Sequence, residues 1–173
     1  MMRIWGPVST LGVSVAIATL IADQAHKWWM LHVYRIQDRG RVRLTPYFDL
    51  VYAKNTGVSY SLFAADSAIG QLLLTLFALL AVLGMLIWLG QNEGRLAAVS
   101  LGLIMGGAVG NAIDRMVLGG VADFFSAHAF GFYWYIFNVA DVAIVAGVAG
   151  LLYESLVLSR SDGVSRNDAA KPD

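Results

Sequence analysis

Residues 96–118 read LAAVSLGLIMGGAVGNAIDRMVL, an apolar run that carries the polar side chains Asn111, Asp114 and Arg115 in its C-terminal third. The run is long enough to cross a lipid bilayer as a helix. Residues three and four positions apart lie on one face of a helix, so these three side chains are expected to lie together. Ionisable side chains inside a membrane span are costly, and each is therefore a candidate functional group. The stretch predicts a membrane helix that carries part of a site near its C-terminal end.

A series of three closely spaced glycines in the same stretch favours tight helix packing. They are Gly106, Gly107 and Gly110. Glycine lets the backbone of a second helix approach closely inside a membrane. A polar clasp between two helices would explain both the glycines and the polar end. Taken alone, this stretch therefore leaves a purely structural role open.

The composition assigns most of the chain to a lipid environment. Of 173 residues, 58% are hydrophobic and 14% are charged, whereas about a quarter of residues are charged in an average soluble domain. The formal net charge is zero, so no basic field exists to attract nucleic acid. Cysteine is absent, which excludes disulfides, thiolate nucleophiles and Cys-ligated zinc. Catalytic chemistry must come from oxygen or nitrogen groups.

Four apolar runs predict a membrane all-α fold, a four-transmembrane-helix bundle. Each run is close to the roughly 20 residues that a helix needs to cross a bilayer. We expect a single integral membrane domain over residues 1–159. The polar tail over residues 160–173 lacks periodicity and is expected to be disordered. The predicted spans are residues 7–30, 69–90, 96–118 and 137–158.

The connection between the first two spans, residues 31–68, is too long for a simple turn. Within it, residues 41–45 alternate charged and apolar side chains, and residues 48–52 are rich in β-formers. Such patterns are typical of short strands. We therefore expect a small β-sheet between the first and second helices that lies on the membrane surface as a cradle or lid.

Other unusual polar residues occur where an up-and-down bundle brings its elements to one membrane face. Asp23 and Lys27 lie near the end of the first span, Asp123 follows the third, and Asn138 and Asp141 open the fourth. Taken singly, each has an ordinary explanation: a self-neutralising pair at the interface, a solvated loop aspartate, and a helix cap. Their agreement on one face favours a functional site.

Aspartates dominate the ionisable groups at that face. Two carboxylates held close in a low-dielectric site share a proton, so one can act as general base for water and the other as general acid. Asp123 and Asp141 bracket the last long connection and are the candidates for this pair. The chain has no H-E-x-x-H metal motif and no G-x-S-x-G nucleophile motif, and its three histidines are scattered. The sequence favours an aspartic hydrolase without a metal site.

An ordered set of motifs resembles that of the lipoprotein signal peptidase (signal peptidase II) family of aspartic peptidases. Each motif alone is weakly specific, but the set runs from the first span to the last and is highly specific as a whole. In the family's order, the motifs are Asp23-Gln24 with Lys27, Asn55-Thr56-Gly57, residues 106–115 (GGAVGNAIDR), residues 121–124 (VADF) and residues 137–141 (FNVAD).

The resemblance implies an intramembrane aspartic endopeptidase that removes the signal peptide of prolipoproteins. Cleavage would fall on the N-terminal side of the diacylglyceryl-modified lipobox cysteine, with Asp123 and Asp141 as the catalytic pair. The family uses no metal or organic cofactor. The resemblance also implies substrate binding by Asn55, Gly57, Asn111, Arg115 and Asn138, and structural support by Asp23, Lys27 and Asp114.

The resemblance also implies where the protein lies and what it meets. It implies the bacterial inner membrane, an active site near the periplasmic face, and cytoplasmic N and C termini. Counting Lys and Arg on the two sides does not decide this orientation. Prolipoproteins and membrane lipids are the implied partners, and the expected state is a monomer. The chain departs from the family at residues 58–60 (VSY) and at Val142, which affects fine substrate contacts rather than the aspartate pair.

Two other classes of protein keep polar groups inside a helix bundle. A small proton-coupled transporter or channel subunit needs such groups at mid-membrane or on both faces, whereas here they gather at one face. A scaffold held together by glycine-mediated packing does not need Asp123 or Asp141. Both alternatives are therefore weaker than the peptidase.

Overall fold

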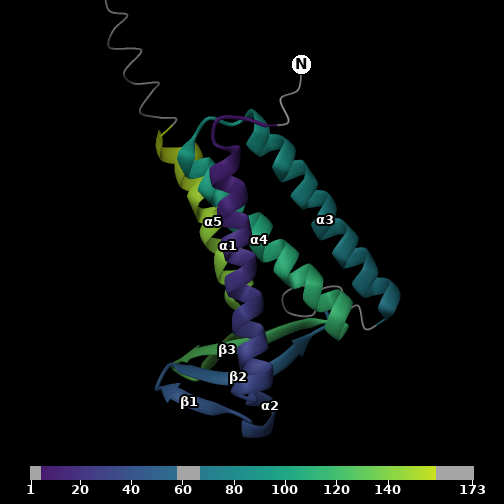
Figure 1. Ribbon diagram of the computed structural model, residues 1–173. Coiled ribbons are helices and arrows are strands. Elements are labelled where there is room, and N and C mark those ends of the chain that lie inside the picture. Colours follow the sequence, from purple (N-terminus) through teal and green to yellow (C-terminus); the bar gives the residue numbers. More distant parts are fainter. Residues whose placement is uncertain (1–4, 58–66, 159–173) are drawn as a thin grey trace, which may run out of the picture.

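The computed structural model describes residues 5–57 and 67–158. Figure 1 shows helices α1, α4 and α5 packed side by side, α3 splayed from them at one end, and a β-sheet across that same end. The described chain begins and ends at the opposite end of the bundle. The helices are α1 (Ser9–Trp28), continued by a π-helical turn η1 (Trp29–Val33), α2 (Ile36–Arg39), α3 (Ala68–Gln91), α4 (Arg95–Leu118) and α5 (Val139–Tyr153), continued by η3 (Glu154–Leu158).

Helix α4 is the centre of the bundle, and its glycines explain why. A Cβ on Gly106 would lie 2.5 Å from the carbonyl oxygen of Ala16 on α1, and one on Gly107 would lie 2.5 Å from that of Ala140 on α5. Both distances are too short for real atoms, so these contacts need glycine. The prediction that the glycines permit close helix approach is confirmed, and α4 packs against two neighbours at once.

Among the described residues, three helical segments are long and apolar enough to cross a membrane: Ala68–Gln91, Arg95–Leu118 and Val139–Leu156. Helix α1 fills the first predicted span, but its polar last turns, with Asp23, Gln24 and Lys27, lower its hydropathy. Three of the four predicted spans are thus supported, and the first stays a prediction.

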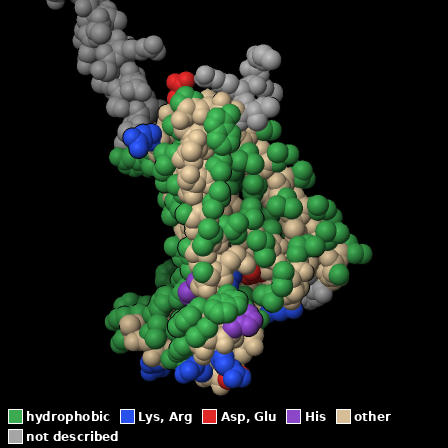
Figure 2. Space-filling view, in the orientation of Figure 1, with side chains coloured by type: hydrophobic (Ala, Val, Ile, Leu, Met, Phe, Trp, Pro, Cys, Tyr) green, Lys and Arg blue, Asp and Glu red, His purple; other side chains and the backbone are tan. Residues whose placement is uncertain are grey.

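Figure 2 shows apolar side chains over most of the visible flank of the bundle and Lys and Arg side chains at the sheet end.

The sheet has four antiparallel strands in the order β1-β2-β3-β4. The two strands expected between the first and second helices are present. The sheet is larger than predicted, because the connection after α4 contributes two more strands. The strands are β1 (Val42–Thr45), β2 (Phe48–Asn55), β3 (Val121–Ala129) and β4 (Phe132–Phe137).

Two boundaries near the site also need correction. Asp123 lies on strand β3 opposite Ala53 of β2, not in a loop. The last helix begins at Val139 rather than at residue 137, because Phe137 ends strand β4 and Asn138 caps α5. Strands β3 and β4 are joined by Phe130 and Gly131, both with positive φ, as a two-residue hairpin turn of the primed type requires.

A small apolar core fastens the sheet to the bundle. Met30 of η1 and Ile36 of α2 are buried against Ala122 and Phe124 of β3. Because Asp123 lies between these two buried β3 residues, its position relative to the helices is fixed from both sides. The departures predicted at residues 58–60 and the tail over residues 160–173 lie outside the described residues.

Candidate active site

The structure brings every predicted site residue to the sheet end of the bundle. Helix α1 contributes Asp23 and Lys27 from its last two turns, and α4 contributes Asn111, Asp114 and Arg115 from its own. The remaining members come from the end of β2, the start of β3 and the start of α5. They are Asn55 with the adjacent Gly57, Asp123, Asn138 and Asp141.

Asp123 is 1% exposed, and two asparagines bind its carboxylate. Nδ2 of Asn138 donates to Oδ1 at 2.7 Å, and Nδ2 of Asn55 donates to Oδ2 at 3.3 Å. Burial, and then the nearby charge of Asp141, raise the pKa of Asp123 to about 7, although the two asparagine hydrogen bonds oppose the shift. Near neutral pH the group is therefore divided between its acid and its carboxylate form.

Asp141 is held at the N-terminus of α5 by a reciprocal cap. Its Oδ2 accepts the backbone N–H of Asn138 at 3.1 Å, while Oδ1 of Asn138 accepts the backbone N–H of Asp141 at 3.0 Å. Such a capping box fixes the side chain and places a carboxylate at the positive end of the helix dipole. Nδ2 of Asn111 donates to the other oxygen at 2.9 Å.

Asn138 connects the two candidate catalytic aspartates. Its side chain is completely buried. Oδ1 of Asn138 caps α5. Nδ2 of Asn138 donates to Asp123 and, at 3.1 Å, to Oδ1 of Asn111. Sequence reasoning predicted the cap, and the structure confirms it. The bridge between the two carboxyl groups follows only from the β3–β4 hairpin, which returns the chain to Asp123.

A buried charge network underlies the pair. The ammonium of Lys27 lies 2.8 Å from Asp23 and 2.8 Å from Asp114, and it donates to Asn111 at 3.1 Å. A self-neutralising pair at the interface would require Lys27 to extend to the membrane surface. Lys27 is 3% exposed and does not do so. Gln24 donates to both Asp23 and Asp114, a link that sequence reasoning missed although Gln24 stands beside Asp23.

Asp114 and Asp23 each also accept a hydrogen bond from the backbone N–H immediately before a candidate catalytic residue. Asp114 accepts the N–H of Ala122, which precedes Asp123, at 3.1 Å. Asp23 accepts the N–H of Ala140, which precedes Asp141, at 3.0 Å. Because Lys27 bridges Asp23 and Asp114, one cation links the supports of both aspartates.

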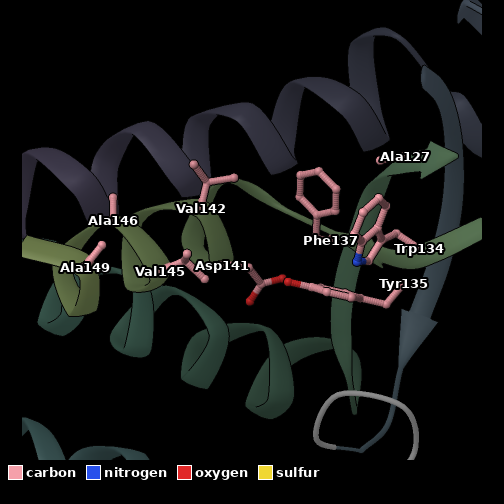
Figure 3. Close-up of a pocket in the computed structure, with 9 residues that line it drawn as sticks. All are labelled: Ala127, Trp134, Tyr135, Phe137, Asp141, Val142, Val145, Ala146 and Ala149. Carbon is pink, nitrogen blue, oxygen red and sulfur yellow. The ribbon is translucent and has the colours of Figure 1, made fainter. Parts of the chain in front are cut away.

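Two hollows meet at Asp141. One is a polar cavity of about 120 Å³. Arg115 lines this cavity, and its guanidinium donates to the backbone carbonyl of Asn111 at 3.3 Å. The other is an apolar groove of about 410 Å³ between β4 and α5, shown in Figure 3. The polar cavity is lined by Asn55, Gly57, Asn111, Arg115, Val121, Tyr135, Ile136 and Asp141.

Tyr135 lines both hollows, and sequence reasoning did not single it out. Its place beside Asp141 depends on residues 132–137 forming strand β4, which leads into α5 and which the sequence pattern did not reveal. Within the described ranges, no group of three or more His, Cys, Asp or Glu side chains is arranged to hold a metal ion. The two carboxyl groups at the site can take part in acid–base chemistry.

Two neighbouring carboxyl groups that can divide acid and base roles are the arrangement of aspartic hydrolases, and here the pair lies at the end of a bundle of apolar helices. Residues 15–157 match the family model described as signal peptidase (SPase) II. The chain belongs to this family and is a peptidase.

The relatives cover nearly the whole chain. The lipoprotein signal peptidase of Beijerinckia indica is 49% identical over 92% of this chain and 95% of its own length. That of Nitrobacter hamburgensis is 51% identical over 84% of this chain and 92% of its own length. A bacterial membrane enzyme solved by the in meso method shares the fold, with a TM-score of 0.70, 23% identity, and coverage of 94% of this chain and 95% of that one.

Proposed function

We propose that this peptidase removes the signal peptide from prolipoproteins by an aspartic mechanism, cutting on the N-terminal side of the diacylglyceryl-modified cysteine. The observation that carries the mechanism is the linkage of Asp123 and Asp141 through Asn138, with both carboxyl groups bound by asparagine side chains. The names of the relatives support the substrate. The polar groups gather at one end of the bundle, which disfavours a transporter.

The pair can divide the two proton transfers that peptide hydrolysis needs. An ionised carboxylate removes a proton from water, whose oxygen attacks the scissile carbonyl carbon, while the protonated partner donates to the carbonyl oxygen. Collapse of the tetrahedral intermediate breaks the C–N bond as a proton passes to the leaving amine. A pKa of about 7 at Asp123 supports its role as the protonated partner.

The remaining polar residues can bind the peptide around the pair. Asn111 and Asn138 hold the carboxylates, and Arg115 and Asn55 line the polar cavity where a substrate carbonyl would lie. The side chain of Asn55 accepts the N–H of Gly57 at 3.0 Å, which fixes the rim of that cavity. Asp23, Lys27 and Asp114 act as structural supports, and the mechanism requires no metal or organic cofactor.

We place the protein in the bacterial inner membrane as a monomeric single domain over residues 1–159, with α1 as a fourth span. The sheet and the site would lie at the periplasmic face, the N and C termini and the tail over residues 160–173 in the cytoplasm. The common position of the two described chain ends, opposite the sheet, supports this arrangement (Figure 1). The apolar flanks would contact membrane lipids, and the apolar groove beside Asp141 gives a lipid-bearing substrate a way in from the side.

The test is cleavage of a diacylglyceryl-modified prolipoprotein by the purified protein in detergent. Asp123→Asn and Asp141→Asn are expected to abolish cleavage, because an amide cannot exchange the shared proton. Asp38→Asn is the matched control, since Asp38 lies on α2 in an exposed pair with Arg35. Thermal unfolding checks that each variant is folded. Full activity in either site variant, or no cleavage by the parent, would contradict the proposal.

A further inference from the structure

Tyr135 lies where the polar cavity and the apolar groove meet. Among the described residues that line the two hollows, Tyr135 and Asp141 are the members common to both. Tyr135 comes from strand β4 and Asp141 from the first turn of α5. A substrate that enters along the groove and presents a peptide bond to Asp141 must therefore pass the ring of Tyr135.

The orientation of the side chain fits a contact with Asp141. Figure 3 shows the phenol oxygen of Tyr135 pointing toward the carboxylate of Asp141, while the ring extends back toward the strand beside Trp134 and Phe137. A tyrosine combines an apolar body with a polar tip, so it can face a groove and a polar cavity at the same time. The neighbouring groove residues offer no other hydroxyl, because they are Ala, Val, Phe and Trp.

Asp141 has acceptor capacity left for such a donor. Its Oδ1 accepts Nδ2 of Asn111 and its Oδ2 accepts the N–H of Asn138. A carboxylate has about four lone-pair sites, so two hydrogen bonds leave room for a third donor. A hydroxyl donor favours the ionised form of the carboxylate, which is the form that a general base must have.

We propose that Tyr135 is a positioning residue of the peptidase: its hydroxyl holds the ionised carboxylate of Asp141, and its ring separates the polar cavity from the apolar groove. This inference rests on the proposed catalytic pair. It assigns Tyr135 no proton transfer of its own. Its two consequences are an effect on turnover and an effect on the pH at which Asp141 becomes usable as a base.

Other charged groups also act on Asp141 and must stay unchanged in the test. Lys27 and Asp23 reach it from α1, Arg115 from α4, and Asp123 from β3. Asp114 of α4 pairs with Lys27. Substitution of Tyr135 leaves all of these groups in place, so a change in the pH profile reports the lost hydroxyl.

The experiment compares Tyr135→Phe with Tyr133→Phe in the detergent cleavage assay. Tyr133 is on the same strand two residues away, is exposed, and lines neither hollow. For Tyr135→Phe we expect kcat to fall about tenfold, KM to change little, and the acid limb of the pH–rate profile to move to higher pH by about one unit. Tyr133→Phe is expected to keep the parent's kcat and profile.

A second variant gives the opposite shift without changing the packing. A fluorinated tyrosine at position 135 has a more acidic hydroxyl and is a stronger donor, so the acid limb is expected to move to lower pH. If Tyr135→Phe fails to fold, the fluorinated variant alone tests whether the hydroxyl of Tyr135 acts on Asp141. A parent-like kcat and profile in Tyr135→Phe, or an unmoved profile in the fluorinated protein, would overturn the role of Tyr135 while leaving the aspartate pair intact. Cleavage that survives Asp141→Asn would instead overturn the proposed function.

Discussion

The carboxylate of Asp23, on helix α1, accepts the backbone N–H of Ala140, on helix α5, at 3.0 Å. The two residues are far apart in sequence, and Ala140 immediately precedes Asp141. The other oxygen of Asp23 lies 2.8 Å from the ammonium of Lys27. One buried side chain therefore balances a cation and also fixes the first turn of the helix that carries a proposed catalytic residue.

Two substitutions separate these roles of Asp23. Asp23→Asn removes the charge but keeps an oxygen for the N–H of Ala140, whereas Asp23→Ala removes both. Breaking a buried ion pair by removing one partner costs about 3 kcal/mol or more, so both variants should lower the free energy of unfolding in detergent. We expect kcat to fall much further in Asp23→Ala, because only that variant releases the backbone before Asp141.

The control for Asp23 is Asp38→Ala. Asp38 forms an exposed pair with Arg35 at 2.9 Å, and exposed pairs contribute about 0–1 kcal/mol. Its unfolding free energy and kcat should stay close to those of the parent. Equal kcat values in Asp23→Ala and Asp23→Asn would contradict the role assigned to the Ala140 contact.

Packing at Gly107 gives a second prediction. A Cβ there would meet the carbonyl oxygen of Ala140 at 2.5 Å and Cγ1 of Ile144 at 2.9 Å. A backbone carbonyl cannot move without its helix, so Gly107→Ala should separate α4 from α5 and destabilise the protein by about 1–3 kcal/mol. Because Asn111 of α4 binds Asp141 of α5, cleavage should fall as well.

Gly84→Ala is the matched substitution for Gly107→Ala. Gly84 lies in the interior of α3, and a Cβ there meets nothing within 4 Å. Alanine in place of an unhindered helical glycine stabilises a helix by roughly 0.5–1 kcal/mol. Thermal unfolding should thus shift in opposite directions for the two variants. A Gly107→Ala protein as stable and active as the parent would show that the two helices can separate without cost.

The helical part of this fold was readable from sequence because its signals are local. Each signal predicts a structure within a few turns of chain. The apolar runs predict helices, the glycines of α4 predict close helix packing, and the four-residue spacing places Asp23 and Lys27 on one face. The structure has the helices, the close contacts and the Asp23–Lys27 pair. Strand β3 was not predicted, since residues 121–124 are all buried and such a strand lacks the alternation of a half-buried one. Tyr135 was missed because residues 132–137 were not predicted to form strand β4, which leads directly into the first turn of α5.

The raised pKa of Asp123 makes stability depend on pH. The pKa rises from an ordinary 3.8 to about 7 because the group is buried beside Asp141, so between these values the folded protein holds a proton that the unfolded chain has lost. Stability therefore falls as pH rises from about 4 to 7, by an amount on the order of 4 kcal/mol. Asp123→Asn cannot ionise and should lose less stability over this range, as chemical unfolding at several pH values would show. Parallel stability curves for the two proteins would contradict the assignment.

The same ionisation should limit catalysis from the alkaline side. Below a pH of about 7, Asp123 is largely protonated and can donate a proton to the scissile carbonyl. Above it both carboxyl groups are ionised and no acid remains, so kcat/KM should decline through this value. The measurement is the pH–rate profile of prolipoprotein cleavage, with Asp49→Asn as control.

Asp49 is a buried carboxylate on β2 outside the pair, and a hydrogen bond from Arg41 keeps its pKa below the usual range. Its loss should therefore leave the alkaline limb unchanged. A parent profile that stays flat to well above neutral pH would show that Asp123 is not the proton donor.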